Sequence, residues 1–81
     1  MRRQVYDDLC IKALNAIKQM PTEEQEKPEI LDIYTALECV LTETDEIKIN
    51  QFYHRIDEFY SVNPDKGLEY LSGKYLLTGA Y

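Results

Sequence analysis

The chain has 81 residues and a mass of 9.5 kDa, which is enough for one small hydrophobic core and no second domain. Hydrophobic residues make up 44% and charged residues 30%, which is typical of a folded chain rather than a disordered one. The net charge of −6 argues against direct binding to nucleic acid or to an anionic membrane surface, since both require a basic face.

The sequence also lacks the patterns of export and membrane insertion. No apolar run approaches the ~20 residues that a membrane helix needs, and the arginines near the start are followed by Asp7 and Asp8 instead of an apolar stretch. Two cysteines, Cys10 and Cys39, are too few for a disulfide scaffold. We therefore expect a cytoplasmic protein with two reduced thiols; a single disulfide in an exported protein is the alternative.

The first expected element is a helix over residues 3–19. Its apolar residues, Val5 and Cys10 among them, fall on one half of a helical wheel. Ile11 is the exception, because it lies among the polar residues on the other half. Pro21 ends the helix, since the residue before a proline is pushed out of the α region.

A second helix is expected to begin at Pro28, which suits a first helical turn. The glutamates between residues 22 and 27 can add a short turn before it. Asp32, Thr35 and Cys39 lie opposite the apolar stripe, so we expect Cys39 to face solvent and Cys10 to be buried. The stripe itself consists of Ile30, Ile33, Tyr34, Leu37, Val40 and Leu41.

A third helix is expected from about Glu46 to Ser61, with the residues from Thr42 to Asp45 supplying capping side chains. The alternation at Ile47–Ile49 leaves a short strand there as the alternative. The reverse face is polar and is expected to face solvent: Gln51, His54, Arg55 and Glu58. The core face is aromatic: Ile49, Phe52, Tyr53, Ile56, Phe59 and Tyr60. Of the tyrosines, Tyr34, Tyr53 and Tyr60 are expected at the core or its edge, each with its hydroxyl reaching water.

A fourth, shorter helix is expected to start at Asn63 and Pro64, because asparagine caps helices and proline fits the first position. Gly73 is expected to weaken its end, and the tail after Gly79 to fray. Its core face consists of Leu68, Leu71 and Tyr75. The sequence therefore predicts an all-α fold, a small bundle of three main helices plus a short C-terminal helix, in one domain over residues 1–81.

Residues that carry chemistry are few. His54 is the only histidine, and it lies on the polar side of its helix, apart from both cysteines. The sequence has no CxxC pair and no glycine-rich phosphate loop, and its one faint likeness to a calcium loop lacks the glycine and the glutamate that such a loop needs. We therefore expect no enzyme activity, no catalytic residue, no metal and no cofactor.

The acidic residues are unevenly distributed. Residues 22–46 hold nine acidic residues and one lysine, a net of −8, while the rest of the chain sums to +2. We expect this block, with the off-stripe Tyr70, to bind a basic partner protein by standing where phosphates would stand. The expected contact residues are Glu23, Glu24, Glu26, Glu29, Asp32, Glu43, Asp45, Glu46 and Tyr70.

The expected function is thus an acidic inhibitor or modulator that occupies the nucleic-acid-binding surface of another protein. In size and charge such a protein is similar to the small acidic proteins that phages use against host defence and DNA enzymes, including those of the anti-CRISPR kind. The alternative is a structural or regulatory subunit that docks an apolar helix face on a partner, or on a second copy of itself as a homodimer. A third interpretation assigns the carboxylates no role beyond a solvated face and acidic helix starts.

Overall fold

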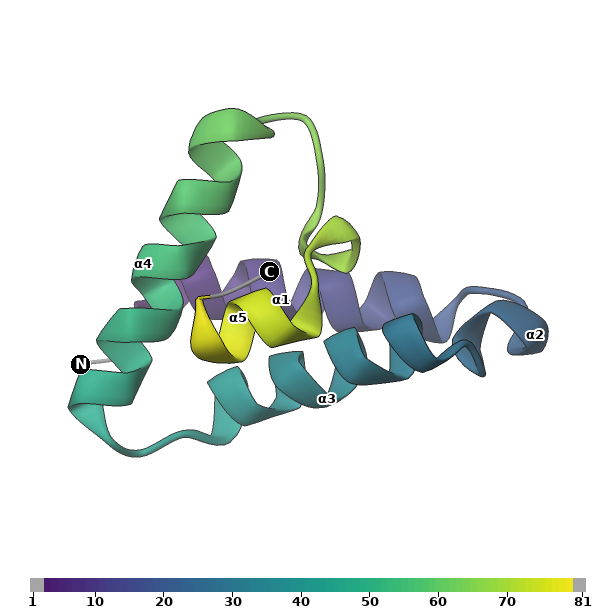
Figure 1. The fold of residues 1–81 in the computed structure, drawn as a ribbon, viewed down its shortest axis with the longest axis horizontal. Helices are drawn as coiled ribbons and strands as arrows, with labels where there is room; N and C mark the ends of the chain where they lie inside the picture. Colours follow the sequence, from purple (N-terminus) through teal and green to yellow (C-terminus); the bar gives the residue numbers. More distant parts are fainter. Residues whose placement is uncertain (1–2, 80–81) are drawn as a thin grey trace.

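The computed structural model describes residues 3–79, and these residues form helices and no strand (Figure 1). The long helices are α1 (Gln4–Lys18), α3 (Pro28–Thr42) and α4 (Glu46–Val62). The short elements are α2 (Thr22–Gln25), the 3-10 helix η1 (Leu68–Tyr70) and α5 (Gly73–Thr78). The all-α prediction, with three main helices and a short C-terminal one, is confirmed. Within residues 3–79 no helix combines the length and the apolarity needed to cross a membrane.

The starts of α3 and α4 follow from local sequence signals. Pro28 occupies the start of α3, and the Asp45 side chain accepts a hydrogen bond of 2.9 Å from the Ile47 backbone N–H at the start of α4. The expected short turn in the glutamate-rich connection is α2. Because α4 begins at Glu46, residues 47–49 lie in its first turn, and the strand considered for them does not form.

The helices are arranged as an antiparallel pair with a third long helix set steeply across it (Figure 1). The chain runs out along α1, turns through α2 and returns along α3, which packs on α1. From the end of α3 the chain turns into α4. The short α5 fills the corner where α3 and α4 diverge, and it contacts both of them. This position makes α5 one of the links between the helical pair and α4.

One hydrophobic cluster runs through all these elements except α2. The expected stripes of α3 and α4 supply most of it, and Ile56, Leu37 and Val40 have no exposed surface. Val5 was expected on the core stripe of α1 and is 71% exposed, because it lies at the edge of that stripe in the first turn. The buried residues are Cys10, Ala13, Ile17, Ile33, Ala36, Leu37, Val40, Ile49, Phe52, Tyr53, Ile56, Phe59, Leu68, Leu71 and Leu76.

The prediction of a helix starting at Asn63 is wrong. Asn63 ends α4 instead: its backbone N–H and its side-chain amide both donate to the Phe59 carbonyl, at 2.9 and 3.2 Å. A turn and η1 follow, and α5 begins only at Gly73, the residue expected to weaken a helix end. Asparagine can bind the unpaired backbone N–H groups at the start of a helix or the unpaired carbonyls at its end, and Asn63 binds a carbonyl at the end of α4. The tail expected to fray after Gly79 lies outside the described residues.

Tyr53 joins α4 to α1 and does not expose its hydroxyl as expected. Its side chain is buried, and its hydroxyl accepts from the Arg3 backbone N–H and donates to the Asp7 carboxylate, both at 3.1 Å. The Tyr6 ring stacks on the Tyr53 ring at 4.6 Å, and the Tyr6 hydroxyl donates to Asp57. This hydrogen bond, followed by burial, raises the pKa of Tyr6. Tyrosine–carboxylate pairs therefore stabilise the α1–α4 contact.

The two thiols should react at very different rates. Cys10 has no exposed surface and Cys39 is exposed on the outer face of α3, as expected from their wheel positions. A chromogenic thiol reagent should therefore titrate one thiol rapidly in the native protein and the second only in denaturant. A Cys39→Ser variant should lose the fast phase. Two fast thiols in the wild type would contradict the placement of Cys10 in the core.

Candidate functional site

The structure divides the acidic block into two groups at opposite ends of α3. Fourteen residues separate Glu29 from Glu43, which is about 21 Å at ~1.5 Å per residue. We call the group at α2 and the start of α3 the acidic end, and the group between α3 and α4 the acidic corner. The acidic end holds Glu23, Glu24, Glu26, Glu29 and Asp32, and the acidic corner holds Glu43, Asp45 and Glu46.

The acidic corner has a structural role in the α3–α4 connection. The Glu43 carboxylate accepts from the backbone N–H groups of Thr44 and Asp45, both at 3.1 Å. Asp45 caps α4, and Glu46 lies in the first turn, where a negative charge stabilises the positive end of the helix dipole. Helix capping and hydrogen bonds within the connection therefore account for the position of these carboxylates.

The acidic end is different, because most of its carboxylates accept no hydrogen bond from the described residues. Glu23, Glu26 and Glu29 are exposed, and their carboxylates form no hydrogen bond or ion pair with residues 3–79. Glu24 pairs with the Lys27 ammonium at 3.0 Å, which raises the pKa of Lys27. The acidic end therefore presents negative charge to solvent.

Gln25 fixes the position of α2. Its side-chain amide donates to the backbone carbonyls of Lys18 at 3.0 Å and Met20 at 2.7 Å, at the end of α1. The short helix is thus hydrogen-bonded to the helix before it and packs on the helix after it. The carboxylates of the acidic end are consequently held on a defined element rather than on a loose connection.

Asp32 belongs to the acidic end in sequence but lies against α5. A Cβ atom built on Gly73 would lie 2.6 Å from both the backbone oxygen and a carboxylate oxygen of Asp32. The Asp32 carboxylate therefore lies beside the first residue of α5. Part of its role is in the α3–α5 packing.

Tyr70 has different chemical surroundings from these carboxylates. Tyr70 is 65% exposed in η1, and the Lys66 ammonium lies 5.2 Å from the centroid of its ring. A cation over the ring makes its immediate neighbourhood positive rather than acidic. Within residues 3–79, no hydrogen bond, ion pair or ring contact joins Tyr70 to the acidic end.

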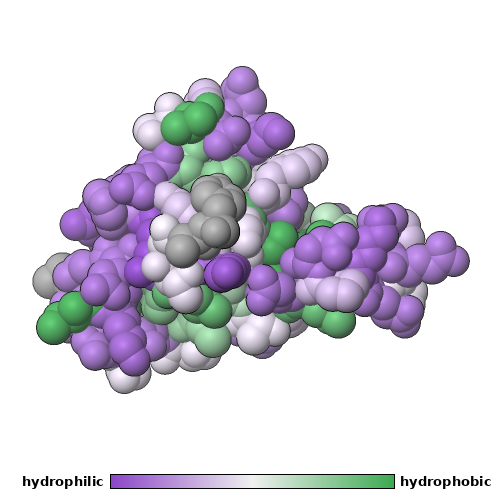
Figure 2. All heavy atoms as spheres, viewed as in Figure 1, coloured by the Kyte–Doolittle hydropathy of each residue, from purple (hydrophilic) through white to green (hydrophobic). Residues whose placement is uncertain are grey.

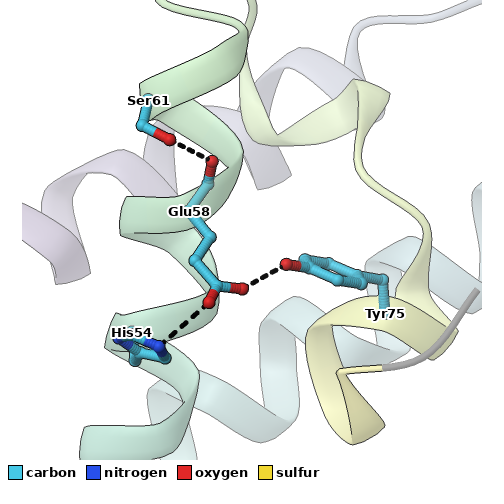
Figure 3. A network of polar contacts seen from close by, with 4 residues as sticks. All are labelled: His54, Glu58, Ser61 and Tyr75. Atoms are coloured by element: carbon cyan, nitrogen blue, oxygen red, sulfur yellow. Dashed lines mark hydrogen bonds and ion pairs between the residues drawn. The ribbon is translucent and has the colours of Figure 1, made fainter.

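A polar network on α4 was not expected from the sequence (Figure 3). Glu58 accepts from the Tyr75 hydroxyl at 2.5 Å, and its other oxygen lies 3.0 Å from His54 Nε2. Arg55 donates to the carbonyls of Leu76 and Leu77, at 3.1 and 2.5 Å. The face of α4 expected to meet solvent is therefore partly covered by α5, because Arg55 and Glu58 hold the short helix there. His54 itself is exposed, as expected.

This network should be visible in the titration of Glu58. The hydrogen bond from Tyr75 lowers the pKa of the Glu58 carboxyl, and His54 and then Arg55 act in the same direction. The native pKa is thus below that of the unfolded chain, so the contribution to stability is present at neutral pH and is lost as the pH falls through the native pKa. By NMR titration, Tyr75→Phe should raise the Glu58 pKa, and His54→Ala should raise it less. A Glu58 pKa unchanged by Tyr75→Phe would contradict the hydrogen bond.

The exposed hydrophobic side chains of α1 and α4 are dispersed along these helices. Ile47 and Val62 lie at opposite ends of α4, about 22 Å apart at ~1.5 Å per residue, and Figure 2 shows separate hydrophobic areas at these ends. Val5 and Ile11 are six residues apart on α1 and point to different sides. Within the described residues no three of His, Cys, Asp and Glu are placed to hold a metal ion.

Comparison with known protein families, with characterised proteins and with solved structures finds no match for this chain. The acidic end remains the candidate site, on the strength of its own charge and geometry.

Proposed function

We propose that this protein is an acidic binding module whose acidic end occupies the basic, nucleic-acid-binding surface of a partner protein and so inhibits or modulates it. The observation that carries the proposal is the contrast between the two acidic groups. Glu43 and Asp45 of the acidic corner accept hydrogen bonds from backbone N–H groups, whereas the carboxylates of Glu23, Glu26 and Glu29 form no hydrogen bond or close ion pair with residues 3–79. Exposed carboxylates held on α2 and α3 suit the attraction of a basic groove.

The spacing of the carboxylates supports the same function. Side chains one helical turn apart, such as Glu29 and Asp32, are separated by about 5–6 Å. This is close to the spacing of phosphates along a nucleic acid strand, so lysines and arginines arranged for phosphates can pair with these carboxylates. The proposal predicts competition: the partner binds either the acidic end or nucleic acid.

A pair of variants with equal net charge tests the location of the site. Glu23→Lys/Glu26→Lys alters the acidic end, and Glu38→Lys/Asp65→Lys alters two exposed carboxylates outside it, which also form no hydrogen bond or ion pair with residues 3–79. Each reversal adds two positive charges, so both variants change the net charge from −6 to −2. General electrostatics are thereby matched, and only the position of the charges differs.

Partners should be captured on the immobilised wild type from its native cells and eluted with duplex DNA. For a partner so eluted, we expect the acidic-end variant to bind about tenfold or more weakly, chiefly through slower association, and the control variant to bind nearly as the wild type. Wild-type affinity should fall steeply between low and physiological salt. Equal binding by the two variants, or a partner that binds DNA and this protein together, would contradict the proposal.

A further inference from the structure

A small pocket opens beside the acidic end, where α1, α2 and α3 meet. Its volume is about 320 Å³, near the lower end of the range for ligand pockets. Leu31 is 53% exposed although it is a large apolar side chain, and Tyr34 is half-buried. Figure 2 shows hydrophobic atoms along α3 next to the hydrophilic end formed by α2. The pocket is lined by Ile17, Thr22, Gln25, Glu26, Leu31 and Tyr34.

The lining combines an apolar wall with oxygen acceptors. Ile17, Leu31 and the ring of Tyr34 supply the wall, and Glu26 supplies a carboxylate. The two side-chain hydrogen bonds of Gln25 both use its amide nitrogen, and its amide oxygen is an acceptor. The pocket therefore suits a group with an apolar stem, a flat face and several hydrogen-bond donors.

We propose that this pocket takes an arginine side chain of the partner. The methylene stem of arginine can lie on Leu31, its planar guanidinium can stack on the Tyr34 ring, and its N–H groups can donate to Glu26. Lysine has the same charge but no planar face and fewer donors in fixed geometry. The proposal rests on the proposed function, because it names the anchor that a basic partner would place next to the acidic end.

Charge complementarity selects arginine over a purely apolar anchor. Glu23 and Glu29 add negative charge beside the carboxylate that lines the pocket, and the nearby Lys27 is paired with Glu24. A leucine would fill the apolar wall but would leave the Glu26 carboxylate partly desolvated without a donor, which is unfavourable. An arginine satisfies both parts of the pocket.

The probes are three short lysine-rich peptides that differ only at the central residue, which is arginine, lysine or leucine. Binding to the full chain is measured by NMR titration at physiological salt. We expect the arginine peptide to bind about fivefold or more tightly than the lysine peptide, with the largest shifts at Glu26, Leu31 and Tyr34. Equal affinity for arginine and lysine, or tighter binding of leucine, would overturn the proposal.

Two variants separate this inference from the proposed function. Tyr34→Leu removes the aromatic face but keeps an apolar side chain in the wall, so it should abolish the preference for arginine while leaving salt-dependent binding of the lysine peptide unchanged. Glu23→Lys/Glu26→Lys should weaken binding of both basic peptides. If Tyr34→Leu keeps the arginine preference, the pocket proposal is wrong and the acidic end stands. If the charge variant binds both peptides as the wild type does, both proposals are wrong. Circular dichroism melts verify that each variant is folded.

Discussion

Phe52→Ala and Ile56→Ala should each leave a large fraction of the protein unfolded at 37 °C. Phe52 is 6% exposed and Ile56 is fully buried, and both project from α4 into the central cluster. Truncating such side chains costs about 2–5 kcal/mol, since the lost burial adds to the cavity left behind. Small domains have free energies of unfolding near the lower end of ~5–15 kcal/mol, so one truncation removes most of this free energy. Urea unfolding followed by circular dichroism measures the loss.

His54→Ala is the matched control on the same helix. His54 lies between these residues in sequence but faces solvent, with 74% of its side chain exposed. Its removal should change the free energy of unfolding by no more than ~0.5 kcal/mol. If His54→Ala destabilised the protein as much as Phe52→Ala, the orientation of α4 about its axis would be wrong.

The long helices were predictable because their signals are local. In α4 an apolar residue recurs every three or four positions from Ile49 to Phe59, and Asp45 provides a cap directly before the first turn. Pro21 follows the end of α1, and Pro28 is the first residue of α3. Each of these signals acts within a few residues, so a single sequence contains it.

The placement of α5 could not be predicted, because contacts distant in sequence decide it. Asn63 can cap either end of a helix, and only the packing of α5 between α3 and α4 shows which end it caps. The sequence predicts that the polar face of α4 faces solvent. In the structure, α5 lies against this face through the hydrogen bonds of Tyr75 with Glu58 and of Arg55 with the Leu76 carbonyl. The sequence predicts that Gly73 weakens a helix end. In the structure, its lack of a side chain permits close contact between α5 and α3.

The acidic block was recognisable as composition but not as a surface. Nine carboxylates follow one another in 25 residues, yet α3 carries its two ends about 21 Å apart. Sequence order also conceals that Glu43 and Asp45 bind backbone amides while Glu23 and Glu26 do not. The sequence pattern could have separated them in part, since Asp45 stands directly before a predicted helix start and Glu23 does not.

Gly73→Ala should destabilise the protein by about 1–3 kcal/mol, although alanine is the better helix former by about 1 kcal/mol. The new Cβ would lie 2.6 Å from the Asp32 backbone oxygen and 2.7 Å from its carbonyl carbon. The backbone of α3 cannot rotate away as a side chain can, so α5 has to move off α3. Because Tyr75 is on α5, the same movement should raise the lowered pKa of Glu58 toward its ordinary value.

Gly67→Ala is the control that separates this contact from the general effect of adding a methyl group. The three atoms nearest to its Cβ would all belong to the Glu69 carboxyl group, and that flexible side chain can turn aside. We expect little change in the urea midpoint and no change in the Glu58 titration. Equal stability of the two variants would contradict the close α3–α5 packing. Destabilisation by Gly73→Ala without a change in the Glu58 pKa would place the strain within α5 and not between the helices. The urea midpoint and the Glu58 titration together therefore decide whether the packing of α5 on α3 keeps α5 in contact with α4.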